Sequence, residues 1–330
     1  MDHRKIYSII YALAALDGRE ATLFGNCGPY AEEAFSRSLA GEAFPEIWFE
    51  IPLAGEPWLD FHSLVSYEDI AGTNAAFSGQ GGVYADAIAW FAAQRPRAVR
   101  QLALSYDTHT GDIEYPAVQV LVTGRDPSVP LGFLEAVGRQ DATESFRTFA
   151  STMPNEWFAC YVGAFPRRQG AGAPPWVRVE CIVGDVLQQA YVDDPATLRE
   201  HLARVGIETI DEDALSNILM LASSPFPLEF QFNIGPEGKA LPVVSASVRF
   251  DAKDWADEAR CGAIADLMRD VQGTGLVDSR WMSLAGTVFS KSLSRDDESV
   301  TFSCFPAFLK LRWREGKPSD AKAYLIAFTQ

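Results

Sequence analysis

The chain has 330 residues, of which 48% are hydrophobic and 22% are charged, and its formal net charge is −16. This composition is typical of a globular protein with a large core, whereas so negative a surface would repel nucleic acid and anionic membranes. The five cysteines are scattered and show no C-x-x-C spacing. We therefore expect free thiols in a cytoplasmic protein, without a disulfide framework and without a metal or other cofactor.

Two helices are expected near the start of the chain, over 6–16 and 30–39. The basic residues at 3–5 and the apolar run that follows imitate a secretory signal. Two tyrosines and a serine dilute that run, however, and Asp17 and Gly18 close it as a helix end. We therefore expect an amphipathic helix there. No later segment reaches the roughly 20 apolar residues that a membrane-spanning helix needs.

A pair of strands then recurs along the chain, each time with one apolar and one polar face. The pairs lie at 48–66, 102–123, 157–183, 228–250 and 308–327. In the last pair, Leu309, Leu311 and Trp313 alternate with Lys310 and Arg312. A period of two is the signature of a β-strand, because successive side chains point to opposite faces.

Helical segments separate these hairpins, and they are expected at 83–93, 130–152, 195–205, 211–222, 253–272 and 279–293. Such helices can cover the apolar faces, which leaves the polar faces to water or a ligand. We therefore expect one α+β domain over 1–330, in which about ten antiparallel strands close around a polar lumen inside an outer layer of helices. Two packed sheets are the alternative for hairpins this irregular.

The final hairpin carries the strongest basic cluster of this acidic chain. The cluster consists of Lys310, Arg312, Arg314, Lys317 and Lys322. In a closed barrel, the members on the polar face would point into the lumen, where they could hold an anion. The alternative is an edge hairpin whose charges are simply solvated.

Antiparallel strand pairs that alternate with helices around a polar centre resemble the prenyltransferase barrel, or ABBA fold. This is the fold of the aromatic prenyltransferases, which include indole-modifying and cyanobactin peptide-modifying enzymes. Residues 48–52 are similar to the early strand in which that family places an acceptor-binding glutamate, here Glu50. Arg178 stands where the indole branch has an Arg-x-Lys-x-Tyr strand, and residues 322–325 match a Lys-x-Tyr-aliphatic pattern.

The chain also departs from the family pattern at three positions. The second hairpin reads 117–119 as Ala-Val-Gln and the fourth reads 245–247 as Ser-Ala-Ser, where the family has cationic residues. Glu180 likewise stands where a lysine is expected. Lys310 and Arg312 of the last hairpin are the candidates to replace the missing cations.

The resemblance implies metal-independent transfer of a prenyl group from an allylic diphosphate, such as dimethylallyl diphosphate, to an aromatic small molecule or a peptide side chain. Cations would stabilise the leaving diphosphate, and aromatic rings would shield the carbocation from water. The diphosphate-binding candidates are Arg178, Arg249, Lys310, Arg312 and Lys322. The candidates for the carbocation shield are Trp157, Tyr161 and Tyr324.

Two residues are candidates for the catalytic base. Glu50 would orient the acceptor and take its proton, and His62 is the alternative base. Either residue has a structural interpretation as well. Glu50 could be a lumen carboxylate paired with a cation, and His62 a hydrogen-bonded histidine without a chemical role.

A second function fits the departures from the family pattern. The barrel could lack prenyl transfer and act as a peptide-binding or natural-product maturation protein. An acidic lumen would repel diphosphate and favour that alternative, whereas a basic lumen near Lys310 and Arg312 would favour the transferase.

Overall fold

The computed structural model describes residues 20–23, 25, 46–65, 82–94, 98–107, 112–165, 177–295 and 298–329. The two helices expected over 6–16 and 30–39 lie outside the described residues. Within the described part, strands and helices alternate along the chain as expected, and the strands form one sheet.

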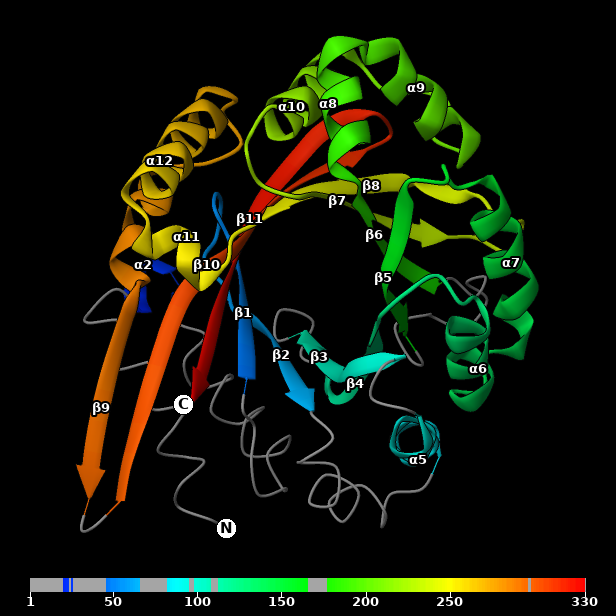
Figure 1. Ribbon diagram of the computed structural model, residues 1–330, viewed down its shortest axis with the longest axis horizontal. Helices are drawn as coiled ribbons and strands as arrows, with labels where there is room; N and C mark the ends of the chain where they lie inside the picture. The colour runs from blue at the N-terminus through cyan, green and yellow to red at the C-terminus, as the bar shows by residue number, and fades with distance from the viewer. Residues whose placement is uncertain are drawn as a thin grey trace.

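The strands close into an antiparallel barrel, seen along its axis in Figure 1. Along the chain, each strand of the ring pairs with the next strand of the ring, and the last strand also pairs with the first, which closes the ring. The expected closed barrel is thus confirmed, and the alternative of two packed sheets is wrong. The ring consists of β1 (Glu46–Pro52), β2 (Asp60–Val65), β3 (Val99–Asp107), β4 (Asp112–Val122), β5 (Trp157–Ala164), β6 (Val177–Val183), β7 (Leu228–Ile234), β8 (Ala240–Arg249), β10 (Glu298–Arg314) and β11 (Lys317–Thr329).

One further strand, β9 (Phe289–Arg295), pairs with the first half of β10 beyond the ring. We expected a helix over 279–293, and that expectation is wrong. Only two short 3-10 helices occur there, η3 (Ser279–Ser283) and η4 (Ala285–Thr287). The serines at 290, 292 and 294 alternate with larger residues, which is a strand period of two.

Helices surround the barrel (Figure 1), and they cover its apolar outer face. They are α2 (Glu20–Leu23), α5 (Val83–Ala93), α6 (Ser128–Ala136), the 3-10 helix η2 (Gln140–Ala142), α7 (Thr143–Thr152), α8 (Asp185–Asp193), α9 (Pro195–Arg204), α10 (Glu212–Ala222), α11 (Ala252–Ala256) and α12 (Glu258–Gly273). The sequence pattern did not predict α8. Among the described residues, no helix is both long and apolar enough to cross a bilayer.

The core of the molecule lies between the barrel and these helices. Outward-facing strand residues such as Phe49, Val179 and Leu311 are fully or almost fully buried in it. Asp194 and Asp211 accept hydrogen bonds from the first turns of α9 and α10, which fixes where these helices begin. Because the apolar strand faces are used in this way, the polar faces point inward.

Candidate active site

Polar side chains from the inner faces of the strands surround a cavity of about 260 Å³. It is lined by Glu50, Asp60, His62, Ser105, Tyr106, Phe165, Arg178, Gln231, Asn233, Val243, Ser245, Arg312, Arg314 and Lys322. A second space of about 30 Å³ shares His62, Arg178 and Gln231 with it, and is bounded by aromatic rings. The lumen therefore has a large polar chamber and a small aromatic one.

Glu50 is the centre of the hydrogen bonding in the lumen. Its carboxylate accepts hydrogen bonds from the Tyr324 hydroxyl at 2.7 Å and from His62 Nε2 at 3.3 Å, and it forms an ion pair with Lys322. The pairing of β1 with β11 places Glu50 directly opposite Tyr324, with Lys322 two residues along on the same face. The barrel closure thus assembles this group.

The surroundings of Glu50 keep its carboxylate ionised. Burial alone would raise the pKa of Glu50, but the charge of Lys322, the hydrogen bond from His62 and the charge of Lys310 together hold that pKa well below its usual range. A carboxylate offers about four lone-pair positions, and three of those on Glu50 are occupied by Lys322, His62 and Tyr324. One position remains for a donor on a ligand.

Lys310 extends the network to the opposite wall. Its Nζ donates to the Tyr324 hydroxyl at 2.8 Å, lies 3.4 Å from Glu180 Oε1, and stands 4.6 Å from the centre of the Tyr324 ring. Burial lowers the pKa of Lys310, while Glu180 and Glu50 oppose that shift. Gln231 donates a further hydrogen bond to Glu180. Lys310 is therefore buried and already paired with an acid, and both of its partners, Tyr324 and Glu180, line the smaller space.

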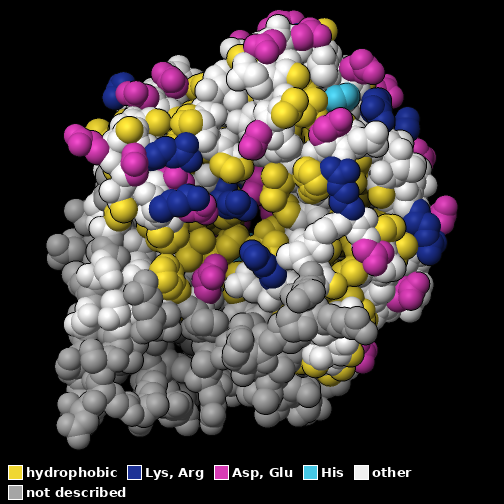
Figure 2. All heavy atoms as spheres, viewed as in Figure 1, with side chains coloured by type: hydrophobic (Ala, Val, Ile, Leu, Met, Phe, Trp, Pro, Cys, Tyr) yellow, Lys and Arg dark blue, Asp and Glu magenta, His cyan; other side chains and the backbone are white. Residues whose placement is uncertain are grey.

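The large cavity carries more positive than negative charge. Four cationic side chains line it, namely Arg178, Arg312, Arg314 and Lys322, against the two carboxylates of Glu50 and Asp60. Arg178 donates to Asn233 Oδ1 at 3.2 Å and lies over the Phe165 ring, and Arg312 Nε is 3.7 Å from Asp320. Figure 2 shows Lys and Arg side chains gathered around the centre of the face seen along the barrel, with hydrophobic side chains between them.

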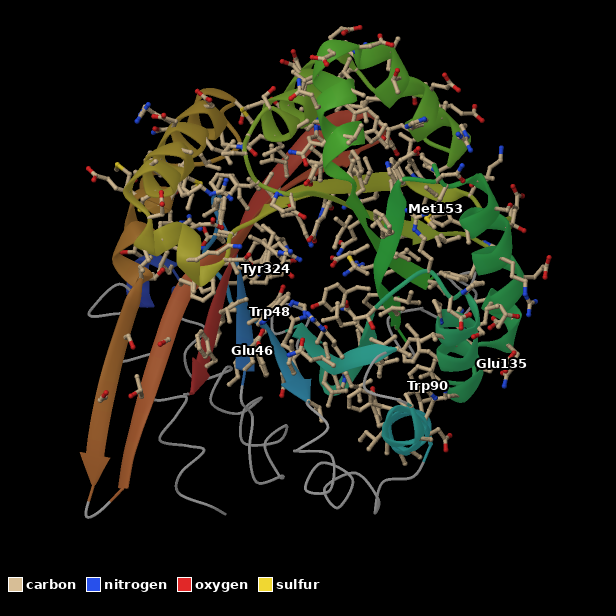
Figure 3. All side chains as sticks on the ribbon, viewed as in Figure 1. Glu46, Trp48, Trp90, Glu135, Met153 and Tyr324 are labelled. Carbon is tan, nitrogen blue, oxygen red and sulfur yellow. The ribbon has the colours of Figure 1, made fainter. Side chains whose placement is uncertain are left out.

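Aromatic rings form the wall of the smaller space. Trp48 lies 5.2 Å from Phe308 and 6.1 Å from Tyr161, and Phe308 lies 5.9 Å from Tyr324, measured between ring centres. Trp48 and Tyr324 point into the barrel interior in Figure 3, where Trp48 also donates to Glu46. Tyr161 and Tyr324 were expected in this place, whereas Trp48 and Phe308 were missed because they are not polar.

Trp157 does not face the lumen, which corrects its expected place in the carbocation shield. Its ring packs against Phe230 and Phe232 on the outer side of the sheet, and its Nε1 donates to the Tyr191 hydroxyl of α8 at 2.8 Å. The cause is a β-bulge between Ala159 and Tyr161. The extra residue of a bulge reverses the alternation of faces, so that position 161 points inward and position 157 outward.

Arg249 and Lys310 are the two predicted diphosphate ligands that line neither cavity. Arg249 is instead paired with acids. Its Nη1 is 3.4 Å from Glu229 and its Nε is 3.8 Å from Asp251. Arg249 on β8 is directly opposite Phe308 on β10, whereas Arg312 lies four residues further along β10. The structure thus brings Arg178, Arg312 and Lys322 together at one cavity, and Lys310 is opposite Lys322 in the sheet.

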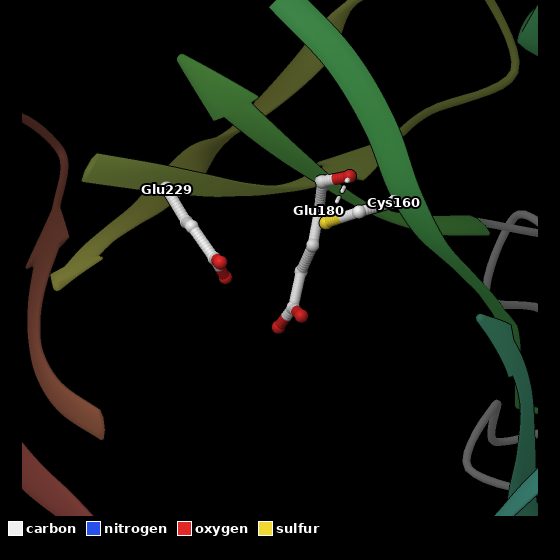
Figure 4. A group of neighbouring side chains, drawn as sticks. All are labelled: Cys160, Glu180 and Glu229. Atoms are coloured by element: carbon white, nitrogen blue, oxygen red, sulfur yellow. Dashed lines mark hydrogen bonds between the residues drawn. The ribbon is translucent and has the colours of Figure 1, made fainter. Parts of the chain in front are cut away.

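Cys160, Glu180 and Glu229 form a cluster on three neighbouring strands (Figure 4), with ligand-type atoms within 4.8 Å of one another. The Cys160 thiol donates to the backbone oxygen of Glu180 at 3.4 Å, and burial raises its pKa. Burial and the charge of Glu180 also raise the pKa of Glu229 to about 8, although Arg249 opposes this. Binding of a cation by this cluster would therefore have to release these protons.

Comparisons with known proteins place this barrel among solved structures. The apo crystal structure of prenyltransferase PriB superimposes over 98% of this chain and 96% of its own, with a TM-score of 0.57 and 13% identity. The chain has the prenyltransferase-barrel fold. The 5-dimethylallyltryptophan synthase from Streptomyces coelicolor superimposes over 98% of this chain and 97% of its own, with a TM-score of 0.56 and 10% identity.

A third prenyltransferase barrel was solved with ligands. This 6-dimethylallyltryptophan synthase from Micromonospora olivasterospora, in complex with DMASPP and Trp, matches with a TM-score of 0.57 at 14% identity, over 95% of this chain and 96% of its own. No protein-family model and no curated protein matches the sequence. At such low identity, the likeness establishes the fold, as the hairpin pattern predicted, and leaves the chemistry to be argued from the lumen.

Proposed function

We propose that this prenyltransferase barrel transfers a prenyl group from an allylic diphosphate, such as dimethylallyl diphosphate, to an aromatic acceptor, without a metal ion. The supporting observation is a cationic cavity that adjoins a wall of aromatic rings in one closed lumen. The charge of this cavity is the feature that separates a transferase from a barrel without diphosphate chemistry.

The cations of the lumen suit the first chemical step. When the allylic carbon–oxygen bond breaks, the electron pair leaves with the diphosphate, and negative charge grows on its oxygens. Arg178 and Arg312 can each offer two parallel N–H groups to such oxygens, and Lys322 adds a point charge. Inside a barrel these charges act at a low dielectric constant, where they stabilise the leaving group more strongly than in water.

The aromatic wall suits the second step. The allyl cation left behind would meet the rings of Trp48, Tyr161 and Tyr324 that line the smaller space, and each ring attracts a cation by about 0.5–2 kcal/mol. The rings also exclude water, which would otherwise capture the cation. An aromatic acceptor carbon then attacks the cation to form the new carbon–carbon bond, and the acceptor loses a proton.

Glu50 is the proposed ligand of the acceptor and the proton acceptor. It retains one free lone-pair position, and an N–H or O–H group of the acceptor could occupy it. Because its pKa is held well below its usual range, we expect Glu50 to orient the acceptor strongly and to bind a proton only briefly. A peptide side chain and a free aromatic molecule both satisfy this chemistry.

Calorimetric titration of dimethylallyl and geranyl diphosphate tests the proposal. We expect micromolar binding to the wild-type protein and a loss of about tenfold or more in Arg312→Ala, because a hydrogen bond to a charged group contributes about 1.5–3 kcal/mol. Arg269→Ala is the matched control, since that arginine is exposed on α12. Turnover is then sought by mass spectrometry with tryptophan and with aromatic peptides. The proposal fails if no allylic diphosphate binds.

A second candidate function is favoured by Glu180 and Glu229. These carboxyl groups lie on the inner wall, and Glu180 already partners Lys310, so that one of the predicted cations is neutralised. A barrel of this kind could bind a peptide without prenyl transfer, as a maturation protein. Binding of aromatic peptides in the absence of any diphosphate binding would support that function instead.

A further inference from the structure

A chain of hydrogen bonds runs from Glu50 to Gln119 across four consecutive strands. Glu50 Oε2 on β1 is 3.3 Å from His62 Nε2 on β2, and His62 Nδ1 is 2.6 Å from Ser105 Oγ on β3. Gln119 Nε2 on β4 donates to the same Ser105 oxygen at 2.9 Å. His62 and Ser105 are directly opposite in the sheet register, so each link joins neighbouring strands.

The groups at the two ends limit the direction of these hydrogen bonds. The Gln119 amide nitrogen can only donate, so Ser105 accepts there and its own hydrogen is available for His62 Nδ1. The Glu50 carboxylate can only accept while it is ionised. His62 Nε2 must therefore carry a hydrogen. The arrangement fits a neutral imidazole that is protonated at Nε2 alone.

Gly163 on β5 makes room for Gln119. A Cβ atom at position 163 would lie 2.9 Å from Gln119 Cγ and 3.3 Å from its Cδ. The two residues are directly opposite across β4 and β5. Glycine inside a strand often marks such a close approach, and here it allows the amide to reach Ser105.

We propose that Gln119, acting through Ser105, keeps His62 neutral and protonated at Nε2, and thereby makes His62 a fixed donor to Glu50. Gln119 stands in the second hairpin, where the resemblance to aromatic prenyltransferases leads one to expect a cation. Its neutral amide donates a hydrogen bond to Ser105 instead. Gln119 and His62 are then positioning residues, and Glu50 alone is available as the base.

This assignment has a consequence for the reaction, and in this respect it rests on the proposed function. An imidazole with a hydrogen on Nε2 cannot take a proton from the direction of Glu50, and its Nδ1 is covered by Ser105. His62 is therefore excluded as the base for an acceptor held at Glu50. Its hydrogen bond instead fixes one oxygen of the carboxylate and leaves the remaining lone pair for the acceptor.

Long-range ¹H–¹⁵N correlation spectra of the histidine rings test the proposal at a fixed pH near 7.5. The chain has four histidines, and His62 is assigned by the signal that disappears in His62→Gln. We expect Nε2 of His62 to be protonated and Nδ1 to be bare in the wild-type protein. A protonated Nδ1 in that spectrum would overturn the proposal.

Gln119→Glu reverses one end of the chain of hydrogen bonds. A carboxylate at position 119 takes the hydrogen of Ser105, so that Ser105 can only accept from His62. We expect Nδ1 to become protonated in most molecules, giving an imidazolium. An unchanged spectrum would overturn the role of Gln119. Gly163→Ala keeps the amide but displaces it, and should shift part of the population the same way.

Added charge alone has to be separated from the reversed hydrogen bond. Glu237→Gln and Gln140→Glu change the charge by one unit at exposed positions away from the two cavities, and both should leave His62 unchanged. In Ser105→Ala the link is absent, so Gln119→Glu should have little further effect in that background.

The charged or titratable side chains that share the two cavities with His62 are Glu50, Asp60, Tyr106, Tyr161, Arg178, Glu180, Arg312, Arg314, Lys322 and Tyr324.

The spectra require no substrate, so this inference and the proposed function fail separately. A wild-type protein that binds no diphosphate would end the proposed function and leave the protonation of His62 standing. If the enzyme is active, the same variants give a kinetic readout. Gln119→Glu should then lower kcat far more than it changes the KM for diphosphate, because only the acceptor side is disturbed.

Discussion

Glu50 is a buried, ionised carboxylate whose cations and donors replace the water that it has lost. Lys322 is its closest partner, and removing one member of a buried ion pair leaves the other uncompensated. We expect Lys322→Met to lower the free energy of unfolding by about 3–5 kcal/mol. Equilibrium denaturation in urea measures this loss.

The double variant Glu50→Gln/Lys322→Met provides the control for that prediction. It removes both charges and keeps groups of similar size, so we expect it to recover most of the stability lost in Lys322→Met. If the single and double variants were equally unstable, the loss would come from packing of the lysine stem and not from the unpaired carboxylate.

Glu229 makes stability depend on pH in a defined direction. Its pKa rises from 4.5 to about 8 on folding, mainly through burial. Between these values the folded protein holds a proton that the unfolded chain has released, so this group lowers stability as pH increases. Glu229→Gln removes the effect. The difference in unfolding free energy between this variant and the wild type should therefore increase in favour of the variant from pH 5 to pH 8, by at most about 1.4 kcal/mol per pH unit.

Thermal or urea denaturation over that pH range checks the prediction for Glu229. The control is Glu237→Gln, which replaces an exposed glutamate in the turn after β7. Its stability profile should run parallel to that of the wild type. A parallel profile for Glu229→Gln as well would show that Glu229 is ionised in the folded protein, paired with Arg249.

At the scale of single elements, the bulge in β5 places Trp157 and Tyr161 on opposite faces of the sheet, although they are four residues apart and would face the same side of a regular strand. Trp157 packs outside the barrel, where it bonds to Tyr191. We expect Trp157→Leu to lower the free energy of unfolding by about 3 kcal/mol and to change diphosphate affinity by less than about twofold. Trp48→Leu is the matched lumen variant, and it should alter ligand binding. If calorimetry finds that Trp157→Leu changes diphosphate affinity more than Trp48→Leu does, this assignment of faces is contradicted.

The strands of the barrel could be predicted from sequence because their period of two is long and regular. The site could be predicted in part, since charged residues at alternate positions had only the lumen to face, and so Glu50, His62 and Lys322 meet there. Bulges are local and leave no such signal, which explains the error at Trp157. The lumen positions of Trp48 and Phe308 were missed because apolar side chains were assigned to the outer face.

The misassigned segment around β9 illustrates a different limit. The sequence predicts a helix over 279–293, yet β10 is long enough to offer a pairing edge beyond the last residues of β8. Residues 289–295 form a strand because the edge of β10 is available for pairing in the folded protein. Local propensity is a weak guide where such a partner exists.

At the scale of the whole molecule, the closed ring argues for one folding unit. Every ring strand has two neighbours within the described chain, and one continuous core connects the barrel to its helices. We expect circular dichroism and tryptophan fluorescence to report a single coincident unfolding transition. Two separated transitions would instead divide the chain into domains and contradict the single-domain prediction.

Ring closure by β11 also dictates when the lumen can exist during synthesis. Glu50 and Lys322 are 272 positions apart in the chain, so the ribosome must add all the intervening strands before the carboxylate can meet its cation. Until then β1 and β10 present open edges that invite pairing with other chains. A premature stop just before β11 should therefore yield an aggregating product, because β1 and β10 would each lose the strand that covers this edge.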